Sequence, residues 1–329
     1  MKVCIVGAGL AGLMAAGRLR DEGHEVVLFD KGRSPGGRLA TRRMGGARLD
    51  HGAQFFTVRS PEFRTHVDRW MADGVVFEWC RGFDGRTDGF PRYAAHGGMN
   101  ALAKHLAHGL DVRCDSLVFS LHRASDASNG TDAADGTDAS DGTGWEVKLD
   151  DGTSITSDAL IVTCPLPQTF SLLVSSGVTM PEELSRTSYD KTLGLLALLD
   201  GPSAVPTPGG VQGESIFTFI ADNQAKGISD APAITLHAGP AWSDEHWDDD
   251  PVVAHDALMA LAAPWIGEAR VIDSQLKRWR FATPRQIWPD PHWSPDDAPT
   301  LVVAGDAFAG PKMEGAALSG LSAAGALLT

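Results

Sequence analysis

The chain has 329 residues, of which 43% are hydrophobic and 21% charged, a composition typical of a globular protein with a sizeable core. The formal net charge of −14 argues against general nucleic-acid binding, which depends on clustered lysines and arginines. The 4 cysteines are isolated and form no C-x-x-C pair, so neither a disulfide framework nor a metal site is indicated and a cytoplasmic location is expected. No apolar run reaches the ~18 residues of a membrane-spanning helix.

The first thirty positions follow the pattern of a β-α-β unit. A β-rich run at 2–6 ends in a glycine, a stretch rich in alanine and leucine then predicts a helix, and a second strand is expected at 25–29. Because such units build parallel sheets, a doubly wound, Rossmann-like domain is predicted.

The turn after the first strand reads Gly7-Ala8-Gly9-Leu10-Ala11-Gly12, a G-x-G-x-x-G string. In a dinucleotide-binding turn the first glycine makes the bend, the second lets the backbone approach a pyrophosphate, and the third lets helix and strand pack. Asp30 ends the second strand, where a carboxylate can accept both hydroxyls of an adenosine ribose. The alternative is a glycine-rich packing turn.

A second phosphate-binding feature follows at Pro35-Gly36-Gly37-Arg38. Its amides and guanidinium could hold the phosphates of FAD, whereas an NAD domain does not need it; the alternative is a flexible turn with a surface arginine. Five arginines crowd positions 33–48, and they could serve the phosphates of FAD, read a 2′-phosphate or pair with surface carboxylates: Arg33, Arg38, Arg42, Arg43 and Arg48.

The C-terminal segment supplies another half-site. A strand at 300–304 delivers Gly305 and Asp306 to its carboxyl end, where ligands of such sheets bind. Asp306 could hold a ribityl hydroxyl, or it could be a helix N-cap. The helix that opens at Glu314-Gly315-Ala316 would direct its dipole at the pyrimidine edge of a flavin.

Between these ends, a helix is expected at 101–108 and strand-like sequence at 112–121. Residues 124–144 contain only small and polar residues, which predicts a flexible acidic insert. The predicted fold is α/β, a doubly wound Rossmann-like FAD-binding domain with a second, mixed β-sheet plus helix substrate domain. The expected boundaries are 1–60, 96–170 and 271–329 for the first domain, and 61–95 and 171–270 for the second.

Several strings also resemble a known family, the renalase-like branch of the flavin amine oxidase superfamily. They occur in the order and spacing of that branch: GAGLAG, FDKGRSPGGRLATRR, LDHGAQFF, HGGMNALAKHL, ALIVTCPLPQ, KRWRFATP and AGDAFAGPKMEGAALSG. The two end strings are shared by the whole superfamily, whereas the intermediate ones, together with IADN at 220–223 and LHAGPAWSDEHW at 236–247, favour renalase.

The resemblance implies that FAD is bound non-covalently. The ADP half would be held by Gly7, Gly9, Leu10, Ala11, Gly12, Asp30, Lys31, Gly37 and Arg38, with Leu117 contacting adenine through its backbone. Gly52, Ala53, Gln54 and Phe55 would run beside the flavin. The ribityl chain and pyrimidine would be held by Gly305, Asp306, Glu314, Gly315 and Ala316.

The resemblance also implies an activity: oxidation of the 2-dihydro and 6-dihydro isomers of NAD(P)H to NAD(P)+, with O2 reduced to hydrogen peroxide. A dihydronicotinamide gives its hydride directly to flavin and needs orientation more than a general base. No catalytic dyad is required, and none is evident. The candidate substrate-pocket residues are Gln54, Asn223, His237 and Trp288; a structural role is at least as plausible for His237.

Three other readings stay open. An amine oxidase or desaturase-like flavoenzyme could use the same scaffold, although only Tyr93 and Tyr189 are present to build the tyrosine cage usual in amine oxidases. An NAD(P)-dependent dehydrogenase would lack flavin, and a non-catalytic FAD protein would not turn over. Lys312 resembles the water-bridging lysine of amine oxidases, but at another spacing, and is expected to face solvent. The expected partners are a small molecule and O2, without nucleic acid or membrane, in a monomer or weak dimer.

Overall fold

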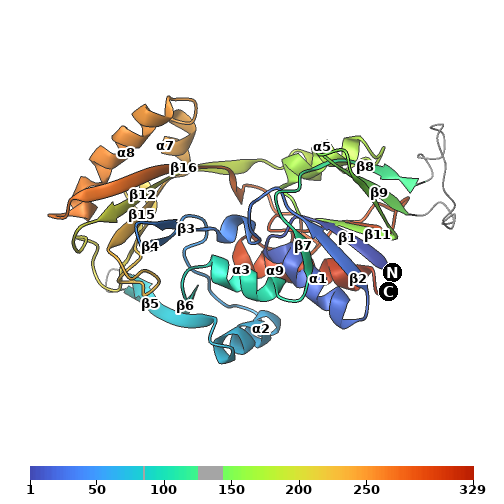
Figure 1. Ribbon diagram of the computed structural model, residues 1–329, viewed down its shortest axis with the longest axis horizontal. Helices are drawn as coiled ribbons and strands as arrows, with labels where there is room; N and C mark the ends of the chain where they lie inside the picture. The colour runs from blue at the N-terminus through green and yellow to red at the C-terminus, as the bar shows by residue number, and fades with distance from the viewer. Residues whose placement is uncertain (84–85, 125–143) are drawn as a thin grey trace. The chain divides into compact units, whose positions relative to one another are not determined.

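The computed structural model describes residues 1–83, 86–124 and 144–329 (Figure 1). Apart from its two end residues, the predicted acidic insert at 124–144 lies outside the described residues. The chain divides into two compact units. Unit 1 comprises Met1–Gly37, Leu106–Ser188 and Pro284–Thr329, and unit 2 comprises Arg38–His105 and Tyr189–Thr283.

Unit 1 is built on a five-stranded sheet with the strand order β17-β11-β1-β2-β7. All four neighbouring pairs run parallel, which confirms the predicted Rossmann-like sheet. The central strand is almost wholly buried, as its apolar sequence KVCIV requires. The strands are β1 (Lys2–Val6), β2 (Glu25–Phe29), β7 (Asp111–Arg113), β11 (Ala159–Val162) and β17 (Leu301–Val303).

Two helices from opposite ends of the chain pack side by side in unit 1 (Figure 1). They are α1 (Leu10–Asp21) and α9 (Lys312–Ala326), both rich in alanine and glycine. A Cβ at Gly320 would overlap the carbonyl oxygen of Ala11, so only glycine allows this approach. The close contact joins the glycine-rich turn to the C-terminal segment within one unit.

A three-stranded antiparallel sheet, in the order β10-β9-β8, completes the β structure of unit 1. The continuous strand expected at 112–121 is wrong, because the chain turns at Asp115, whose φ is +52°, and the Asp115 amide donates to Gly32 O at 2.9 Å. This turn separates β7 from β8. The remaining elements are β8 (Val118–Arg123), β9 (Trp145–Leu149), β10 (Ser154–Ser157), α5 (Leu166–Val174) and α6 (Glu182–Ser185).

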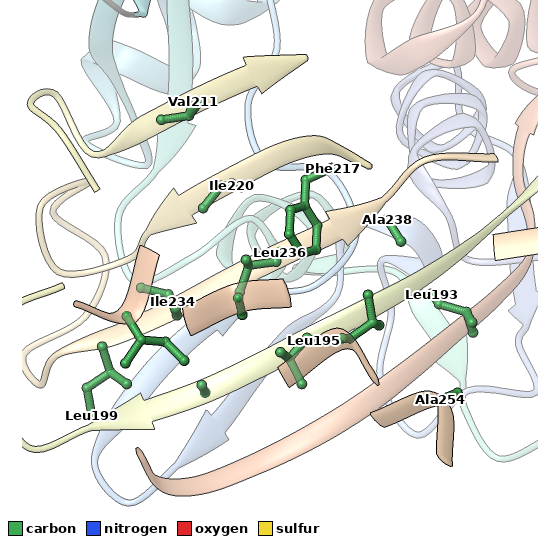
Figure 2. Close-up of a cluster of buried hydrophobic side chains, with 14 residues drawn as sticks. Leu193, Leu195, Leu199, Val211, Phe217, Ile220, Ile234, Leu236, Ala238 and Ala254 are labelled. Atoms are coloured by element: carbon green, nitrogen blue, oxygen red, sulfur yellow. The ribbon is translucent and has the colours of Figure 1, made fainter. Parts of the chain in front are cut away.

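Unit 2 contains a second five-stranded sheet, in the order β13-β14-β15-β12-β16. One face forms the apolar core shown in Figure 2, where alternate residues of β12 such as Leu193 and Leu195 meet Leu236 of β15 and Ala254 of α8. The elements are β12 (Tyr189–Leu199), β13 (Gly210–Glu214), β14 (Phe217–Asp222), β15 (Ala233–Ala238), β16 (Val271–Pro284), α7 (Pro240–Glu245) and α8 (Pro251–Ile266). This unit confirms the predicted separate sheet-and-helix part of the α/β fold.

The other face of this sheet is covered by a hairpin of β3 (Thr41–Met44) and β4 (Ala47–Asp50). Apolar residues of the hairpin pack on Leu196 and Leu198 of β12. Gly45 and Gly46 form its turn with φ of +49° and +87°, the left-handed angles that a tight two-residue hairpin turn requires. The hairpin thereby places Asp50 and the residues after it against the sheet.

The rest of unit 2 comes from its N-terminal stretch. Helix α2 (Pro61–Ala72) begins with Ser60, whose hydroxyl accepts from the Phe63 amide at 3.2 Å, a standard N-cap. The helix expected at 101–108 is confirmed as α3. The elements are η1 (Gly37–Leu39), β5 (Val76–Phe83), β6 (Arg86–Ala95) and α3 (Asn100–Ala107).

The compact units differ from the expected domain boundaries at residues 38–60, 96–105, 171–188 and 271–283. The first of these segments packs in unit 2 because its hairpin buries apolar side chains on β12. A unit defined by packing is not necessarily one that binds a cofactor alone. The division into an FAD-binding and a substrate domain therefore stays a prediction.

Candidate functional site

The glycine-rich turn of unit 1 is tight on one side and open on the other. Gly7 has φ of +105°, and an added Cβ would lie 2.6 Å from Thr163 Oγ1; a Cβ at Gly12 would overlap Gly7 O. In contrast, a Cβ at Gly9 meets no atom within 4 Å. The fold thus explains why glycine is required at positions 7 and 12. Gly9 instead borders open space that a ligand can approach.

Polar groups surround this open space. The first amides of a helix have no intrahelical partner. Gly9, the N-cap of α1, has no side chain that could accept from them, so they can bind an anion. The Asp30 carboxylate accepts from the Ala8 and Gly32 amides at 2.8 and 2.7 Å, which fixes its orientation and leaves lone pairs for ribose hydroxyls. These features fit the phosphates and ribose of a dinucleotide.

The C-terminal loop of unit 1 is held by its glycines. Gly305 adopts φ of +147°, its amide donates to Ser319 Oγ at 2.8 Å, and the following Asp306 is 9% exposed. A Cβ at Gly315 would overlap Gly310 O, so the loop folds against the first turn of α9. The residue before Asp306 is thereby tied to α9, whose first turn contains Glu314.

Trp288 lies beside the same loop. Its amide donates to Ala307 O at 2.7 Å, and its carbonyl accepts from the Ala309 amide at 2.8 Å. The indole Nε1 is buried without a hydrogen-bond partner among the described residues. An indole N–H normally finds an acceptor when buried, so Trp288 retains a donor for a ligand in unit 1.

In unit 2, sequence reasoning missed a fully buried ion pair between Asp50 and Lys226. Both side chains have 0% exposure, and Nζ lies 2.8 Å from Oδ2. The other carboxylate oxygen accepts from Thr41 Oγ1 at 2.6 Å and from the Met99 amide at 2.8 Å. Burial lowers the pKa of Lys226, and Asp50 opposes that shift. The two residues are 176 positions apart, and neither stands in a periodic pattern that would have indicated burial.

Two predicted pocket residues attach to this ion pair. Asn223 is fully buried; its Oδ1 accepts from the Asp50 amide at 3.3 Å, and its Nδ2 donates to Thr235 Oγ1 at 3.0 Å. Its amide is therefore occupied by protein contacts. Gln54 Nε2 donates to Asp50 O at 2.6 Å, whereas its buried Oε1 has no partner in the described parts of the chain.

The residue after Asp50 carries a flat aromatic platform. The ring of His51 stacks on Trp279 with centroids 5.4 Å apart and an interplanar angle of 24°. The His51 carbonyl accepts from Trp279 Nε1 at 2.6 Å and lies 3.2 Å from His237 Nε2. One carbonyl therefore fixes both neighbouring rings.

Both histidines of this platform are neutral at pH 7. Burial lowers the pKa of His51 to about 4, and the positive charges of Lys277 and Arg42 contribute. Burial also lowers the pKa of His237 to about 4, opposed by its hydrogen bond to His51. A neutral imidazole can accept or donate a hydrogen bond but adds no charge.

Other predicted cofactor residues in unit 2 have structural contacts. Arg38 Nη1 donates to the carbonyls of Phe281 and Ala282 at 3.3 and 3.2 Å, and the Ala53 amide donates to Arg38 O at 2.8 Å. A Cβ at Gly52 would overlap Arg38 O. Phe55 packs in a cluster with three further aromatic rings.

The remaining candidates occupy the surface of unit 1. Lys31 is exposed at the end of β2, and Lys312 is exposed at the first residue of α9, as the sequence predicted. Leu117 O accepts from the Asp150 amide at 3.0 Å.

Burial raises the pKa values of Cys4 and Cys164 to about 12, so neither is a reactive thiolate.

The structure thus brings Gln54, Asn223 and His237 together around residues 50–51 of unit 2, whereas Trp288 belongs to unit 1. Among residues 1–83, 86–124 and 144–329, no cluster of three or more histidine, cysteine or acidic residues is arranged for a metal ion. None of the helices in these ranges is long and apolar enough to cross a membrane.

Family models match almost the whole chain. Residues 5–70 match an NAD(P)-binding Rossmann-like domain, and residues 70–328 match the flavin containing amine oxidoreductase family. The second match covers well over half of the sequence. The fold of unit 1 agrees with the first.

Curated relatives are similar to this chain over a short segment. The 1-hydroxycarotenoid 3,4-desaturase of Flavobacterium sp. (strain P99-3) is 44% identical over 57 residues, which are 17% of this chain and 12% of that protein. The 4,4'-diapophytoene desaturase of Staphylococcus aureus (strain Newman) is 42% identical over 52 residues, 16% of this chain and 10% of that protein. The matched segment is thus about a tenth of each relative's length.

Solved structures share the fold over the full length. A putative protoporphyrinogen oxidase from Exiguobacterium sp. 255-15 has a TM-score of 0.70 at 12% identity and covers 98% of both chains. A putrescine oxidase bound to putrescine has a TM-score of 0.71 at 14% identity and covers 100% of this chain and 99% of that one. At these identities the likeness concerns the fold alone.

Replacing Gly9 with valine tests the open space at the turn. Because an added Cβ meets no protein atom, Gly9→Val should fold normally but purify with little FAD, with a Kd for FAD raised at least about tenfold. Gly17→Val is the matched control, because Gly17 lies within the helix that Gly9 caps and a Cβ there also meets nothing within 4 Å. Flavin absorbance per protein measures occupancy; full FAD in Gly9→Val would contradict the assignment.

The neutral histidines predict a stability that falls in acid. Because the pKa values of His51 and His237 are about 4 when folded and 6.5 ordinarily, the unfolded chain binds more protons between these values. Each contribution is fully present above pH 6.5 and is lost as the pH falls toward 4. Each histidine should lose about 2 kcal/mol of its contribution between about pH 7.5 and about pH 5. In urea unfolding the loss should therefore be about 2 kcal/mol larger in wild type than in His237→Gln, which retains His51. Equal losses in both proteins would contradict it.

Proposed function

Because the chain belongs to the flavin containing amine oxidoreductase family and so has FAD as its cofactor, we propose that it oxidises 2-dihydro and 6-dihydro isomers of NAD(P)H to NAD(P)+. When bound, FAD would accept the hydride and pass the electrons to O2, giving hydrogen peroxide. The observation that carries the proposal is the His51–Trp279 stack, fixed through one carbonyl beside a neutral His237.

In unit 1, we assign the cofactor's ADP half to the turn around Gly9 and to Asp30. The first amides of α1 would bind the pyrophosphate, and the carboxylate, oriented by two backbone amides, would accept the ribose hydroxyls. Asp306 and the N-terminus of α9 are assigned to the ribityl chain and the pyrimidine. These roles follow the resemblance and agree with the open space at Gly9.

In unit 2, the platform suits a flat, neutral ring. A dihydronicotinamide can stack on an aromatic surface, and the buried Oε1 of Gln54, which has no partner within the described residues, can accept from a carboxamide N–H. Neither histidine carries charge at pH 7. These residues orient the ring and exclude water, which is what direct hydride transfer asks of a protein.

Amine oxidation is less well supported by the same residues. Tyr93 is 3% exposed, stacks on Phe56 and accepts from Arg64 at 2.8 Å. Tyr189 is 9% exposed and packs edge-on against Phe281. Both tyrosines are therefore part of the packing of unit 2, and neither is available for an aromatic cage.

Anaerobic reduction of the purified holoenzyme tests the proposal. A borohydride-prepared mixture of dihydronicotinamide isomers should rapidly bleach the flavin band near about 450 nm, and oxygen should restore it with formation of hydrogen peroxide. Putrescine and other simple amines, run in parallel, should leave the band unchanged. Bleaching by amines and not by the isomers would contradict the proposal and indicate an amine oxidase. A protein that neither substrate bleaches would also contradict it.

A further inference from the structure

A hydrogen-bonded chain of a serine, a histidine and an aspartate connects α8 with β16 in unit 2. Ser274 Oγ lies 2.8 Å from Nε2 of His255, and the other ring nitrogen, Nδ1, lies 2.8 Å from Oδ1 of Asp256. Both distances fall in the range expected between a nucleophile, its base and the group that orients the base. None of the three residues is assigned to FAD or to the substrate platform.

The order of the three groups sets the direction of proton transfer. An ionised carboxylate can only accept a hydrogen bond, so a neutral His255 ring donates to Asp256 through Nδ1–H and keeps Nε2 as an acceptor. The hydroxyl of Ser274 then donates to Nε2. In this arrangement an imidazole can remove the proton of a serine that attacks a carbonyl carbon.

Regular secondary structure holds both ends of the chain. Asp250 caps the first turn of α8, and Ala254, the residue before His255, is buried in the apolar core of unit 2. On β16, Leu276 packs against the same core, and Ser274 lies two positions earlier on the same face of the strand. The geometry of the three groups is therefore fixed by packed elements and needs no ligand to form.

A shallow depression adjoins the histidine. It has a volume of about 370 Å³ and is lined by Pro251, Val252, His255, Gln275, Leu276 and Lys277. Three of these residues are apolar, and the side chain of Val252 is 65% exposed. An uncovered apolar surface next to the imidazole suits a short acyl chain.

A backbone donor for a developing negative charge lies at the edge of the sheet. Strand β16 is the last strand of its sheet, and within the described ranges no other strand pairs with its outer edge. Because successive N–H groups of a strand point to opposite edges, the amide of either Ser274 or Gln275 faces this outer edge. Such an unpaired N–H can donate to the oxygen of a tetrahedral intermediate.

We propose that Ser274, His255 and Asp256 form a second, hydrolytic site that cleaves carboxylic esters with a short apolar acyl chain. Ser274 Oγ bonds to the acyl carbon while His255 Nε2 takes the hydroxyl proton, and the alcohol leaves with that proton when its C–O bond breaks. Water, deprotonated by the same nitrogen, then attacks the acyl-serine and restores the hydroxyl. The products are one acid and one alcohol. No electron is transferred, so this activity does not depend on FAD.

Labelling of the purified holoenzyme with a fluorescent fluorophosphonate tests the nucleophile. Peptide mass spectrometry should locate the label on Ser274, and His255→Gln should react at least about tenfold more slowly, because the hydroxyl loses its base. Ser322→Ala is the matched control and should be labelled like wild type. Ser322 Oγ lies 2.9 Å from His292 Nδ1, but no described carboxylate is hydrogen-bonded to the other nitrogen of that ring. Labelling of Ser322, or a wild-type Ser274 that stays unlabelled, would overturn the proposal.

Hydrolysis of p-nitrophenyl acetate and butyrate measures turnover, with FAD content as the check that each variant is folded. Ser274→Ala, His255→Gln and the double variant should each lose at least about tenfold in kcat/KM, and all by the same factor, because residues that act as one unit are not additive. Asp256→Ala should lose only about two- to fivefold, because that carboxylate is exposed.

A contact that merely ties α8 to β16 predicts equal hydrolysis by wild type and Ser274→Ala. That result would overturn the hydrolytic site and leave the proposed flavin chemistry untouched. Losses that add up in the double variant would also contradict it, because they would show two independent effects rather than one catalytic unit.

Discussion

The Asp50 carboxylate and the Lys226 ammonium are both removed from water, and the arrangement of unit 2 around residues 50–54 depends on them. A buried charge is tolerated only when paired and hydrogen-bonded. Asp50 meets that condition by accepting also from Thr41 and Met99, which ties β4 to β3 and to the start of α3. Removing either side chain would leave the other charge buried and unpaired, which would lower the free energy of unfolding by about 3–5 kcal/mol.

This constraint explains how a loop can present an ordered platform. With Asp50 fixed, its backbone amide donates to Asn223 and its carbonyl accepts from Gln54. The next carbonyl, that of His51, contacts the rings of Trp279 and His237. The internal charges cancel at the ion pair, and both histidines of the platform are uncharged at pH 7. A neutral aromatic surface suits a flat, uncharged ring, which links the packing of unit 2 to the proposed substrate.

More of the fold and of the candidate site could be predicted from the two ends of the sequence than from its middle. The turn at Gly7–Gly12 and the segment at Gly305–Gly315 are local motifs whose geometry depends on neighbouring glycines, so the Rossmann-like sheet and the FAD cofactor could be read from them. The ion pair joins residues 176 positions apart, and no local pattern encodes it. Asn223 was predicted as a pocket residue that could hydrogen-bond a nicotinamide, and that role stays a prediction. Its side-chain amide contacts the backbone of Asp50 and Ala233 and the hydroxyl of Thr235, groups that only the folded chain brings close.

Flavin reduction measured across pH with deuterated substrate tests direct hydride transfer on a neutral platform. The rate constant should be flat from roughly pH 5.5 to about pH 9, because the pKa values of both histidines are about 4. Deuterium at the ring carbon that loses hydride should slow the reaction, whereas D2O should not. A bell-shaped profile with a solvent isotope effect, and none from the substrate, would show that a protein acid or base carries the chemistry instead.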